Sequence, residues 1–237
     1  MRLDKFLCKS TDLSRSAATK KILQGAVCVN GEPVTTESTQ VHENNLITLD
    51  GIVLKPRASR YVMLHKPAAT ICSNIDEAYP SLFNYLDIDR AEDMHVVGRL
   101  DADTTGLVLI TDDGRWSFDI IRPQMKCKKV YRVGLRDPIA PDAALRFEQG
   151  LQLQGEKALT RPAQLEVINE KEVLLTITEG KYHQVKRMFA AIGNRVVSLH
   201  REKIGAISLD IAMGQWRHLT PNEINSFATE KPAEAIA

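Results

Sequence analysis

The sequence lacks several features on which enzymatic function is often built. Its 237 residues contain only four cysteines and six histidines, with no Cys-x-x-Cys pair and no histidine at the spacing of a zinc site. No metal is therefore expected, and the cysteines are expected to be reduced thiols, mostly buried. A P-loop and a dinucleotide-binding fingerprint are also missing, so no nucleotide cofactor is expected.

Long apolar segments are absent as well. No run approaches the roughly 18 apolar residues that a membrane span requires, and the first ten residues, MRLDKFLCKS, are charged where a secretory signal would be apolar. The sequence therefore predicts a cytoplasmic protein without a membrane association, with a monomer as the default state. With 43% hydrophobic residues, the chain can still bury a substantial core.

Charge is nearly balanced overall, at +1, but it is unevenly distributed. Residues 1–25 carry six bases against two acids, residues 122–136 six bases and no acid, and residues 181–203 six bases against one acid. Residues 76–113 instead carry ten acids against two arginines. One basic run is commonly a solvated face, but three such runs around an acidic segment favour binding to nucleic acid.

The first sixty residues are expected to form a compact unit. Apolar residues repeat at helical spacing in residues 3–7, and Ser14 can cap a second helix that runs to about residue 24. The dipeptides Asn30-Gly31 and Asp50-Gly51 each lie between alternating apolar residues, which is typical of a hairpin. Two helices followed by two small hairpins are predicted.

A polar stretch at 55–60 is expected to link this unit to a larger domain, residues 61–237. Its predicted strands are 61–64, 96–97, 107–111, 130–135, 165–168, 173–178, 196–199 and 207–209, and its predicted helices lie near 116–121, 141–149 and 184–192. Thr220 to Glu223 has the pattern of a capping box that begins a short terminal helix, and the tail 229–237 is expected to be disordered. The pattern indicates an α+β fold with a mainly antiparallel or mixed sheet flanked by helices.

The segment from His95 to Gly114 is the most unusual of the chain, because a charged loop with glycines lies there between two apolar strands. Loops held by rigid strands commonly carry catalytic side chains. On pattern alone, a turn stabilised by Asp and Thr side chains explains the segment equally well.

Motifs in both parts of the chain resemble known families. RLDKFL at 2–7, SRSAA at 14–18 and GAVCVNG at 25–31 resemble the alpha-L RNA-binding module of a ribosomal small-subunit protein and of several RNA-modifying enzymes. GRLDADTTGLVLITDDG at 98–114 resembles the catalytic motif of the pseudouridine synthase family that acts on ribosomal RNA. HKP at 65–67, KVYRVGL at 129–135 and EGKYHQVKRMF at 179–189 match further motifs of that family in order, so the resemblance covers about residues 61–219.

Two stretches are most similar to the branch of this family that acts on small-subunit (16S) ribosomal RNA. They are DDGRWS at 112–117 and EGKYHQVKRMFAAIGN at 179–194. One departure is visible, because relatives usually have glycine two residues after the Lys-Pro pair, whereas here Pro67 is followed by Ala68-Ala69.

The resemblance implies that the larger domain isomerises one uridine to pseudouridine without a cofactor, in ribosomal RNA of an assembling small subunit. Asp101 would be the essential residue and would begin the cleavage of the bond between uracil N1 and ribose C1′. It would act either as a nucleophile or by removing a ribose proton, and both routes stay open. Lys186 would be the ionic partner of Asp101, and Tyr131 would place its ring against the target uracil.

Further residues are assigned to substrate and RNA by the same resemblance. Arg99 would help hold the target nucleotide out of its stack, Leu199 would line an apolar pocket, and Arg187 is a second basic residue beside Lys186. In the N-terminal module, phosphate contacts are expected from Arg2, Lys5, Arg15 and Lys20. A phosphate contact for Lys186 and a packing role in the sheet for Tyr131 remain alternatives.

Three other functions remain open. The first is a large-subunit ribosomal RNA enzyme of the same fold, since motifs shared across the family do not encode the target uridine. The second is a non-catalytic RNA-binding or ribosome-assembly factor, which the basic runs alone would support. The third is a hydrolase with Asp101 and Asp103 as an acid/base pair, which is disfavoured because the two side chains are not expected to share a site.

Overall fold

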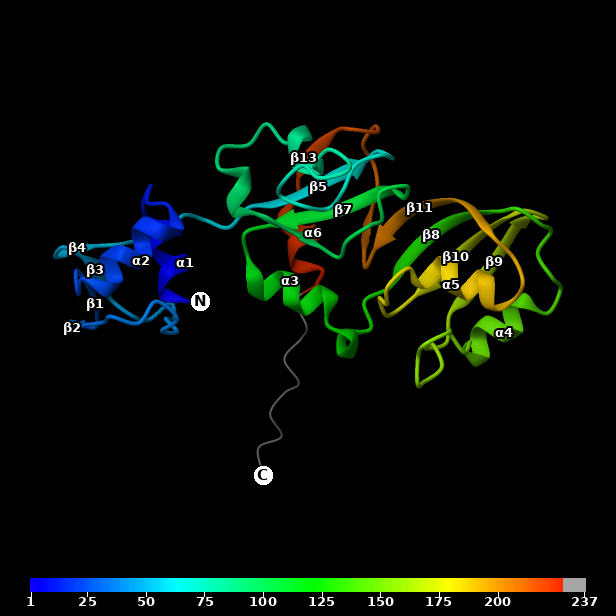
Figure 1. Cartoon of the computed structure of the whole chain (residues 1–237), viewed down its shortest axis with the longest axis horizontal. Helices are drawn as coiled ribbons and strands as arrows, with labels where there is room; N and C mark the ends of the chain where they lie inside the picture. Colours follow the sequence, from blue (N-terminus) through cyan, green and yellow to red (C-terminus); the bar gives the residue numbers. More distant parts are fainter. Residues whose placement is uncertain (228–237) are drawn as a thin grey trace, which may run out of the picture. The chain divides into compact units, whose positions relative to one another are not determined.

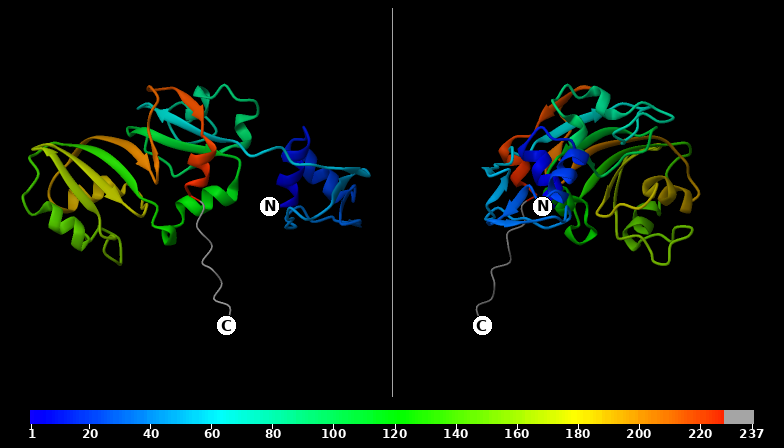
Figure 2. Two further views of the ribbon diagram at one scale, coloured as in Figure 1. Left: turned by 180° about the vertical axis from the view of Figure 1, so that it is seen from behind. Right: turned by 60° about the vertical axis from the view of Figure 1, so that its left-hand side comes forward.

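The computed structural model describes residues 1–227, and the chain divides into two compact units (Figures 1 and 2). The first unit is Met1–Ser59 and the second begins at Arg60. The tail that the sequence predicts to be disordered, 229–237, lies outside the described residues. Among those residues, no helix is long and apolar enough to cross a membrane.

The first unit contains two short helices and one four-stranded sheet. Its elements are α1 (Leu3–Ser10), α2 (Arg15–Leu23), β1 (Val27–Val29), β2 (Glu32–Pro33), β3 (Ile47–Leu49) and β4 (Ile52–Val53), with the strands in the order β2-β1-β3-β4. Both predicted helices and both hairpins are confirmed. Ser14 caps α2, because its hydroxyl accepts a hydrogen bond from the Ala17 N–H at 3.3 Å.

A nine-stranded mixed sheet forms the centre of the second unit (Figure 1). Its strands are β5 (Tyr61–Lys66), β6 (His95–Val97), β7 (Thr105–Thr111), β8 (Lys129–Leu135), β9 (Gln164–Asn169), β10 (Glu172–Ile177), β11 (Val196–Ile204), β12 (Ile207–Ser208) and β13 (Trp216–His218). The main order is β13-β5-β7-β11-β8-β10-β9, with β6 paired to β7 and β12 paired to β11. The β7 and β11 strands run parallel, whereas the other paired strands are antiparallel.

Helices cover both faces of this sheet. Val62 and Leu64 of β5 point into a core that includes Phe147 of α4 (Ala143–Gln149) and Phe189 of α5 (Gln184–Ala191), whose ring centroids are 5.0 Å apart. Met63 points to the other face, towards α3 (Gly114–Ile121) and α6 (Pro221–Asn225). Successive side chains of a strand point to opposite faces, so one strand contributes to both cores.

The predicted elements of the second unit are confirmed. Each predicted strand and helix is present, and the capping box of α6 is formed between Thr220 and Glu223. Strand β13 and the short 3-10 helices Leu82–Tyr85, Ala91–Asp93 and Pro123–Met125 were not predicted. The expectation of mostly buried cysteines was wrong: all four are free thiols, but only Cys72 is buried.

The parallel pairing of β7 with β11 positions the loop that precedes β7. Gly106 pairs with Arg201, and its backbone has a φ of 111°, which favours glycine. A Cβ atom at this position would overlap the backbone of Arg201. Glycine is therefore required where the Thr-x-Gly-Leu part of the motif enters the sheet.

Candidate active site

The loop between β6 and β7 carries Asp101 and is held from the interior by a lysine. Lys66, at the end of β5, is fully buried, and burial lowers the pKa of its ammonium. Its Nζ donates hydrogen bonds to the carbonyl oxygens of Pro67 at 3.0 Å, Ala102 at 3.3 Å and Thr104 at 2.8 Å. The backbone on the C-terminal side of Asp101 is thereby fixed to β5.

The turn after the Lys-Pro pair contributes a further contact to this loop. Ala69 has a φ of 57°, in the left-handed region that favours glycine, and its N–H donates to the carbonyl of Ala102 at 2.9 Å. Ala69 is the position at which the family resemblance leads us to expect glycine. The alanine therefore retains the turn, at the expense of some backbone strain.

The carboxylate of Asp101 lies between two groups from the start of α5. The Lys186 ammonium is 3.1 Å from one carboxylate oxygen, and His183 Nε2 is 3.4 Å from the other. His183 precedes α5 and has a φ of 48°. The same ammonium also donates to both oxygens of Asp103, at 2.7 and 2.9 Å.

The expectation that Asp101 and Asp103 do not share a site was wrong. The loop is bent here, because the Thr104 N–H donates to the Asp101 carbonyl at 3.1 Å and closes a turn over residues 101–104, and Lys186 contacts both side chains. The hydrogen bond from Lys186 lowers the pKa of Asp103. Burial lowers the pKa of Lys186, but hydrogen bonds to Asp103 and Asp101 outweigh it and raise that pKa. A carboxyl group with a lowered pKa is a poor general acid, which argues against the hydrolase.

Arg201 is the largest fully buried side chain of the described residues, and the sequence analysis missed it. Its guanidinium donates to the carbonyl oxygens of Leu107 and Gly98, each at 2.8 Å, and to the Tyr131 hydroxyl at 3.4 Å. Gly98 lies before Asp101 in the chain and Leu107 lies after it. Arg201 therefore ties both ends of the loop to the ring of Tyr131.

A cavity of about 630 Å³ lies between this loop, the sheet and the start of α5. Its volume is within the range typical of small-ligand sites. Five of the six residues predicted for catalysis and substrate binding line it: Asp101, Tyr131, Lys186, Arg99 and Leu199. The lining also includes residues that the sequence analysis did not single out, among them Lys129, Lys181, Tyr182, His183 and Arg201.

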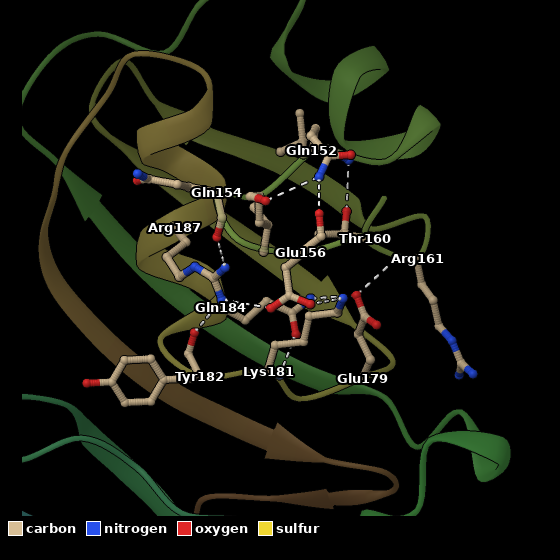
Figure 3. A network of polar contacts seen from close by, with 12 residues as sticks. Gln152, Gln154, Glu156, Thr160, Arg161, Glu179, Lys181, Tyr182, Gln184 and Arg187 are labelled. Carbon is tan, nitrogen blue, oxygen red and sulfur yellow. Dashed lines mark hydrogen bonds and ion pairs between the residues drawn. The ribbon is translucent and has the colours of Figure 1, made fainter. Parts of the chain in front are cut away.

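Arg187 is the predicted residue that does not line the cavity. It belongs instead to a network of polar contacts (Figure 3). Its guanidinium is paired with Glu156 at 3.1 Å and donates to the carbonyl oxygens of Tyr182 at 3.0 Å and Gln154 at 2.6 Å. Glu156 also accepts a hydrogen bond from Lys181 at 2.9 Å, and together these two cations lower its pKa. Arg187 thus joins the loop after α4 to the turn that carries Tyr182 and His183.

A second part of this network, around Glu179, also fixes this turn (Figure 3). Glu179 accepts hydrogen bonds from the Arg161 N–H at 2.9 Å and from the Gln184 amide at 2.7 Å. The Gln184 side chain in turn accepts the Lys181 N–H at 2.8 Å. Residues 179–184 are thereby held in the conformation that brings His183 to Asp101.

In the N-terminal unit, two of the four predicted RNA contacts are engaged internally. Asp4 is buried, and both Arg2 and Arg15 pair with it at 3.1 Å. Burial raises the pKa of Asp4, but hydrogen bonds from Arg2, from the Lys5 N–H and from Arg15 outweigh it and lower that pKa. The side chains of Lys5 and Lys20 are exposed and have no polar partner among residues 1–227.

Several charges of the basic runs are also used inside the second unit. Lys129 and Arg201 are buried, Lys186 and Arg187 pair with acids, and Arg132 pairs with Glu172 and Glu202. In the part of the chain that the structure describes, no group of three His, Cys, Asp or Glu side chains could hold a metal ion.

Both units of the chain match known proteins. Residues 60–191, which include Asp101, Tyr131 and Lys186, match the family described as RNA pseudouridylate synthase, and residues 1–47 match the S4 domain. A ribosomal small subunit pseudouridine synthase A from Vibrio parahaemolyticus is 52% identical over 230 residues, 95% of this chain and 99% of the relative. The protein of that name from Escherichia coli K12 is 48% identical over 229 residues, again 95% and 99%. A crystal structure of a pseudouridylate synthase, 46% identical, covers 96% of this chain and 99% of its own, with a TM-score of 0.71.

Proposed function

Because the chain belongs to the RNA pseudouridylate synthase family, we propose that it isomerises one uridine of small-subunit ribosomal RNA, with Asp101 as the essential residue. The observation that carries this proposal is the Asp101 carboxylate, held 3.1 Å from the Lys186 ammonium at a cavity of about 630 Å³. Relatives of nearly full coverage named for the small ribosomal subunit support the choice of target.

The proposed mechanism begins when the target uridine leaves its stack and enters the cavity. Unstacking one base costs on the order of a few kcal/mol. The Asp101 carboxylate then acts on the ribose, as a nucleophile at C1′ or as the base that removes a ribose proton. Tyr131 and Leu199 offer the uracil an aromatic face and an apolar contact, and Arg99 holds the extruded nucleotide. The detached uracil turns so that C5 meets C1′ and a carbon–carbon bond forms.

The proposal extends to the setting of the reaction. The S4 domain, residues 1–47, would hold the RNA through its exposed lysines, and the second unit would present the active site. The substrate would be the RNA of an assembling small subunit, and the enzyme would work as a monomer in the cytoplasm.

The reaction and its target can be tested with one assay. Purified protein is incubated with unmodified small-subunit RNA, with partly assembled particles and with large-subunit RNA, and pseudouridine is mapped by carbodiimide-dependent reverse-transcription stops. We expect one new stop, in the small-subunit RNA alone. A stop in large-subunit RNA would overturn the target, and RNA binding without any stop would favour the binding factor.

Asp101→Asn tests the essential residue, with Asp103→Asn as the matched control. Both carboxylates contact Lys186, but Asp103 is 72% exposed at its side chain and Asp101 is 32% exposed. Asp101→Asn should abolish product while RNA binding is retained, and Asp103→Asn should retain most of the activity. Product from the Asp101→Asn protein would rule the assignment out.

Lys186→Met tests the ionic partner. Removal of the ammonium leaves Asp101 without its cation, so we expect a loss in single-turnover rate of roughly 100-fold with little change in RNA affinity. Lys186→Arg should restore part of the rate. The opposite pattern, weaker RNA binding with an unchanged rate, would assign Lys186 to a phosphate.

A further inference from the structure

A second lysine of the cavity, Lys129, is a buried cation with little to neutralise it. It is the first residue of β8, only 8% exposed, and it lines the cavity. Its Nζ donates to the Cys127 carbonyl at 3.5 Å, at the outer limit for a hydrogen bond. Within residues 1–227, no carboxylate lies within ion-pair distance of it. An ammonium has three N–H donors, so most of its bonding capacity is unused by the protein.

The other buried cations of this region differ in that respect. Lys66 donates to three carbonyl oxygens, and Arg201 donates to two carbonyl oxygens and a hydroxyl. A buried charge is unfavourable unless it is paired or hydrogen-bonded. Burial, above all, lowers the pKa of Lys129, and the neighbouring charge of Arg201 acts in the same direction. Such a group in a cavity indicates a negative charge that arrives with the ligand.

The position of Lys129 selects the base of the nucleotide over its phosphates. Lys129 and Tyr131 are two residues apart on β8, so both side chains lie on one face of the strand, with their Cα atoms about 7 Å apart. The strand partner of Lys129 on β10 is Ile177, which also lines the cavity. Phosphates remain hydrated, and the exposed side chains of Lys126 and Lys128 are available to bind them. A uracil ring stacked against Tyr131 would instead lie within reach of the buried Lys129.

We propose that Lys129 is a catalytic residue that stabilises the negative charge on the detached uracil, an inference that rests on the proposed function. When the N1–C1′ bond breaks, its electron pair stays on N1, and the charge spreads over O2 and O4. C5 then bonds to C1′, the C5 proton leaves, and N1 takes up a proton, so the product has the atoms and electrons of the substrate. Neutral uridine gains little from the ammonium, so the effect falls on the rate.

Lys129→Met and Lys129→Arg test this role, because the first keeps most of the length of the side chain without its charge and the second keeps the charge. Lys129→Met should lower the single-turnover rate roughly 100-fold with unchanged RNA affinity, and Lys129→Arg should restore most of it. An unchanged rate in Lys129→Met, or a loss confined to RNA affinity, would overturn the proposal. So would an equal loss in both variants.

The pH profile gives a readout that a packing role would not affect. Since the lysine must be protonated and its pKa is lowered, the wild-type rate should fall as the pH rises through that pKa. Lys129→Arg should keep its rate to higher pH, because arginine stays protonated. A wild-type alkaline decline that persists unchanged in Lys129→Arg would contradict the inference.

A binding measurement separates this proposal from the proposed function. Barbiturate, a planar pyrimidine anion, should raise the melting temperature of the wild-type protein and of Lys129→Arg, but not that of Lys129→Met. This result would support the anion site even if no RNA were modified, whereas the absence of pseudouridine with wild-type protein would refute the proposed function alone. Equal stabilisation of all three proteins, or of none, would overturn the Lys129 site.

Discussion

The guanidinium carbon of Arg201 lies 5.9 Å from the centre of the Tyr131 ring, and the guanidinium also donates to the hydroxyl of that ring. The ring is therefore supported from one side by a residue that also holds both ends of the Asp101 loop. Position and orientation of Tyr131 thus depend on a group that does not need to contact the RNA.

Tyr131→Phe and Tyr131→Leu separate the roles of the hydroxyl and the ring. Tyr131→Phe keeps the ring and should retain most of the activity. Tyr131→Leu removes the stacking surface, worth about 1–3 kcal/mol per base, and should lower the rate accordingly. Single-turnover assays and melting curves check this, and a fall in melting temperature without a fall in rate would show that Tyr131 only packs in the sheet.

Arg201→Met should be destabilising and inactivating together. It leaves the carbonyl oxygens of Gly98 and Leu107 without their donor in the interior, at about 1–3 kcal/mol for each unsatisfied group. Arg132→Met is the control, since Arg132 lies on the neighbouring strand with a half-exposed side chain. We expect a clear drop in melting temperature and rate for Arg201→Met only; similar melting curves for the two variants would contradict the assignment.

Arg187 and Glu156 should stabilise the protein jointly, as one ion pair, and should not contribute to substrate binding. Arg187→Met and Glu156→Gln each break the pair that joins the loop after α4 to residues 181–184. The double variant should therefore melt no lower than the less stable single variant, as is typical of coupled residues. Additive effects, together with weaker RNA binding in Arg187→Met alone, would instead support the substrate role that the sequence predicts.

In the N-terminal unit, Lys5 and Lys20 should differ from Arg2 and Arg15. Lys5→Gln and Lys20→Gln should weaken RNA binding without changing the melting temperature. The slope of the logarithm of the binding constant against the logarithm of the salt concentration should become shallower by about 1 for each lost phosphate contact. Arg2→Met and Arg15→Met should lower the melting temperature, because each removes a partner of the buried Asp4. Salt titrations of RNA binding test the role of the lysines, and melting curves test the role of the arginines. An Arg2→Met protein with an unchanged melting temperature would contradict the stabilising role of the arginines.

Glu223 should make the stability of the second unit depend on acid pH. Hydrogen bonds from Arg217 lower the pKa of Glu223 from 4.5 to about 2. A lowered pKa means that the stabilisation is fully present above pH 4.5 and is lost as the pH falls towards 2, by about 1–2 kcal/mol for a partly solvated pair. The difference in melting temperature between wild-type and Glu223→Gln should shrink on acidification, whereas the exposed Glu170→Gln should match wild-type at every pH.

Sequence patterns predicted the secondary-structure elements that have a local periodic signal and the site residues that lie in a family motif. Alternating apolar residues located the strands, and the Asn-Gly and Asp-Gly dipeptides located the hairpins, because these signals depend on neighbouring residues alone. Among the site residues, Asp101, Tyr131 and Lys186 were accessible only through resemblance to a family.

What the sequence did not reveal are the internal cations. Lys66 was noted only within the HKP motif, and Lys129 and Arg201 only within basic runs, with no sign that they are buried. Burial of a charged side chain depends on how segments distant in the sequence pack around it, as Gly98 and Leu107 do around Arg201. Arg187 shows the converse error, because it follows Lys186 in the motif but points to Glu156. Successive helical residues face different directions, so adjacency in a motif does not place two side chains at one site.

Lys66 and Arg201 anchor the Asp101 loop, and this anchoring determines whether the protein loop or the RNA must become ordered when the two bind. Carbonyl oxygens at Gly98, Ala102, Thr104 and Leu107 already accept hydrogen bonds from these two buried cations, so we expect the loop to change little when RNA arrives. The entropy loss of assembling the reactive geometry then falls on the extruded nucleotide, while the protein side is fixed at the time of folding. Selection among uridines would accordingly reflect how readily each one leaves its own RNA structure.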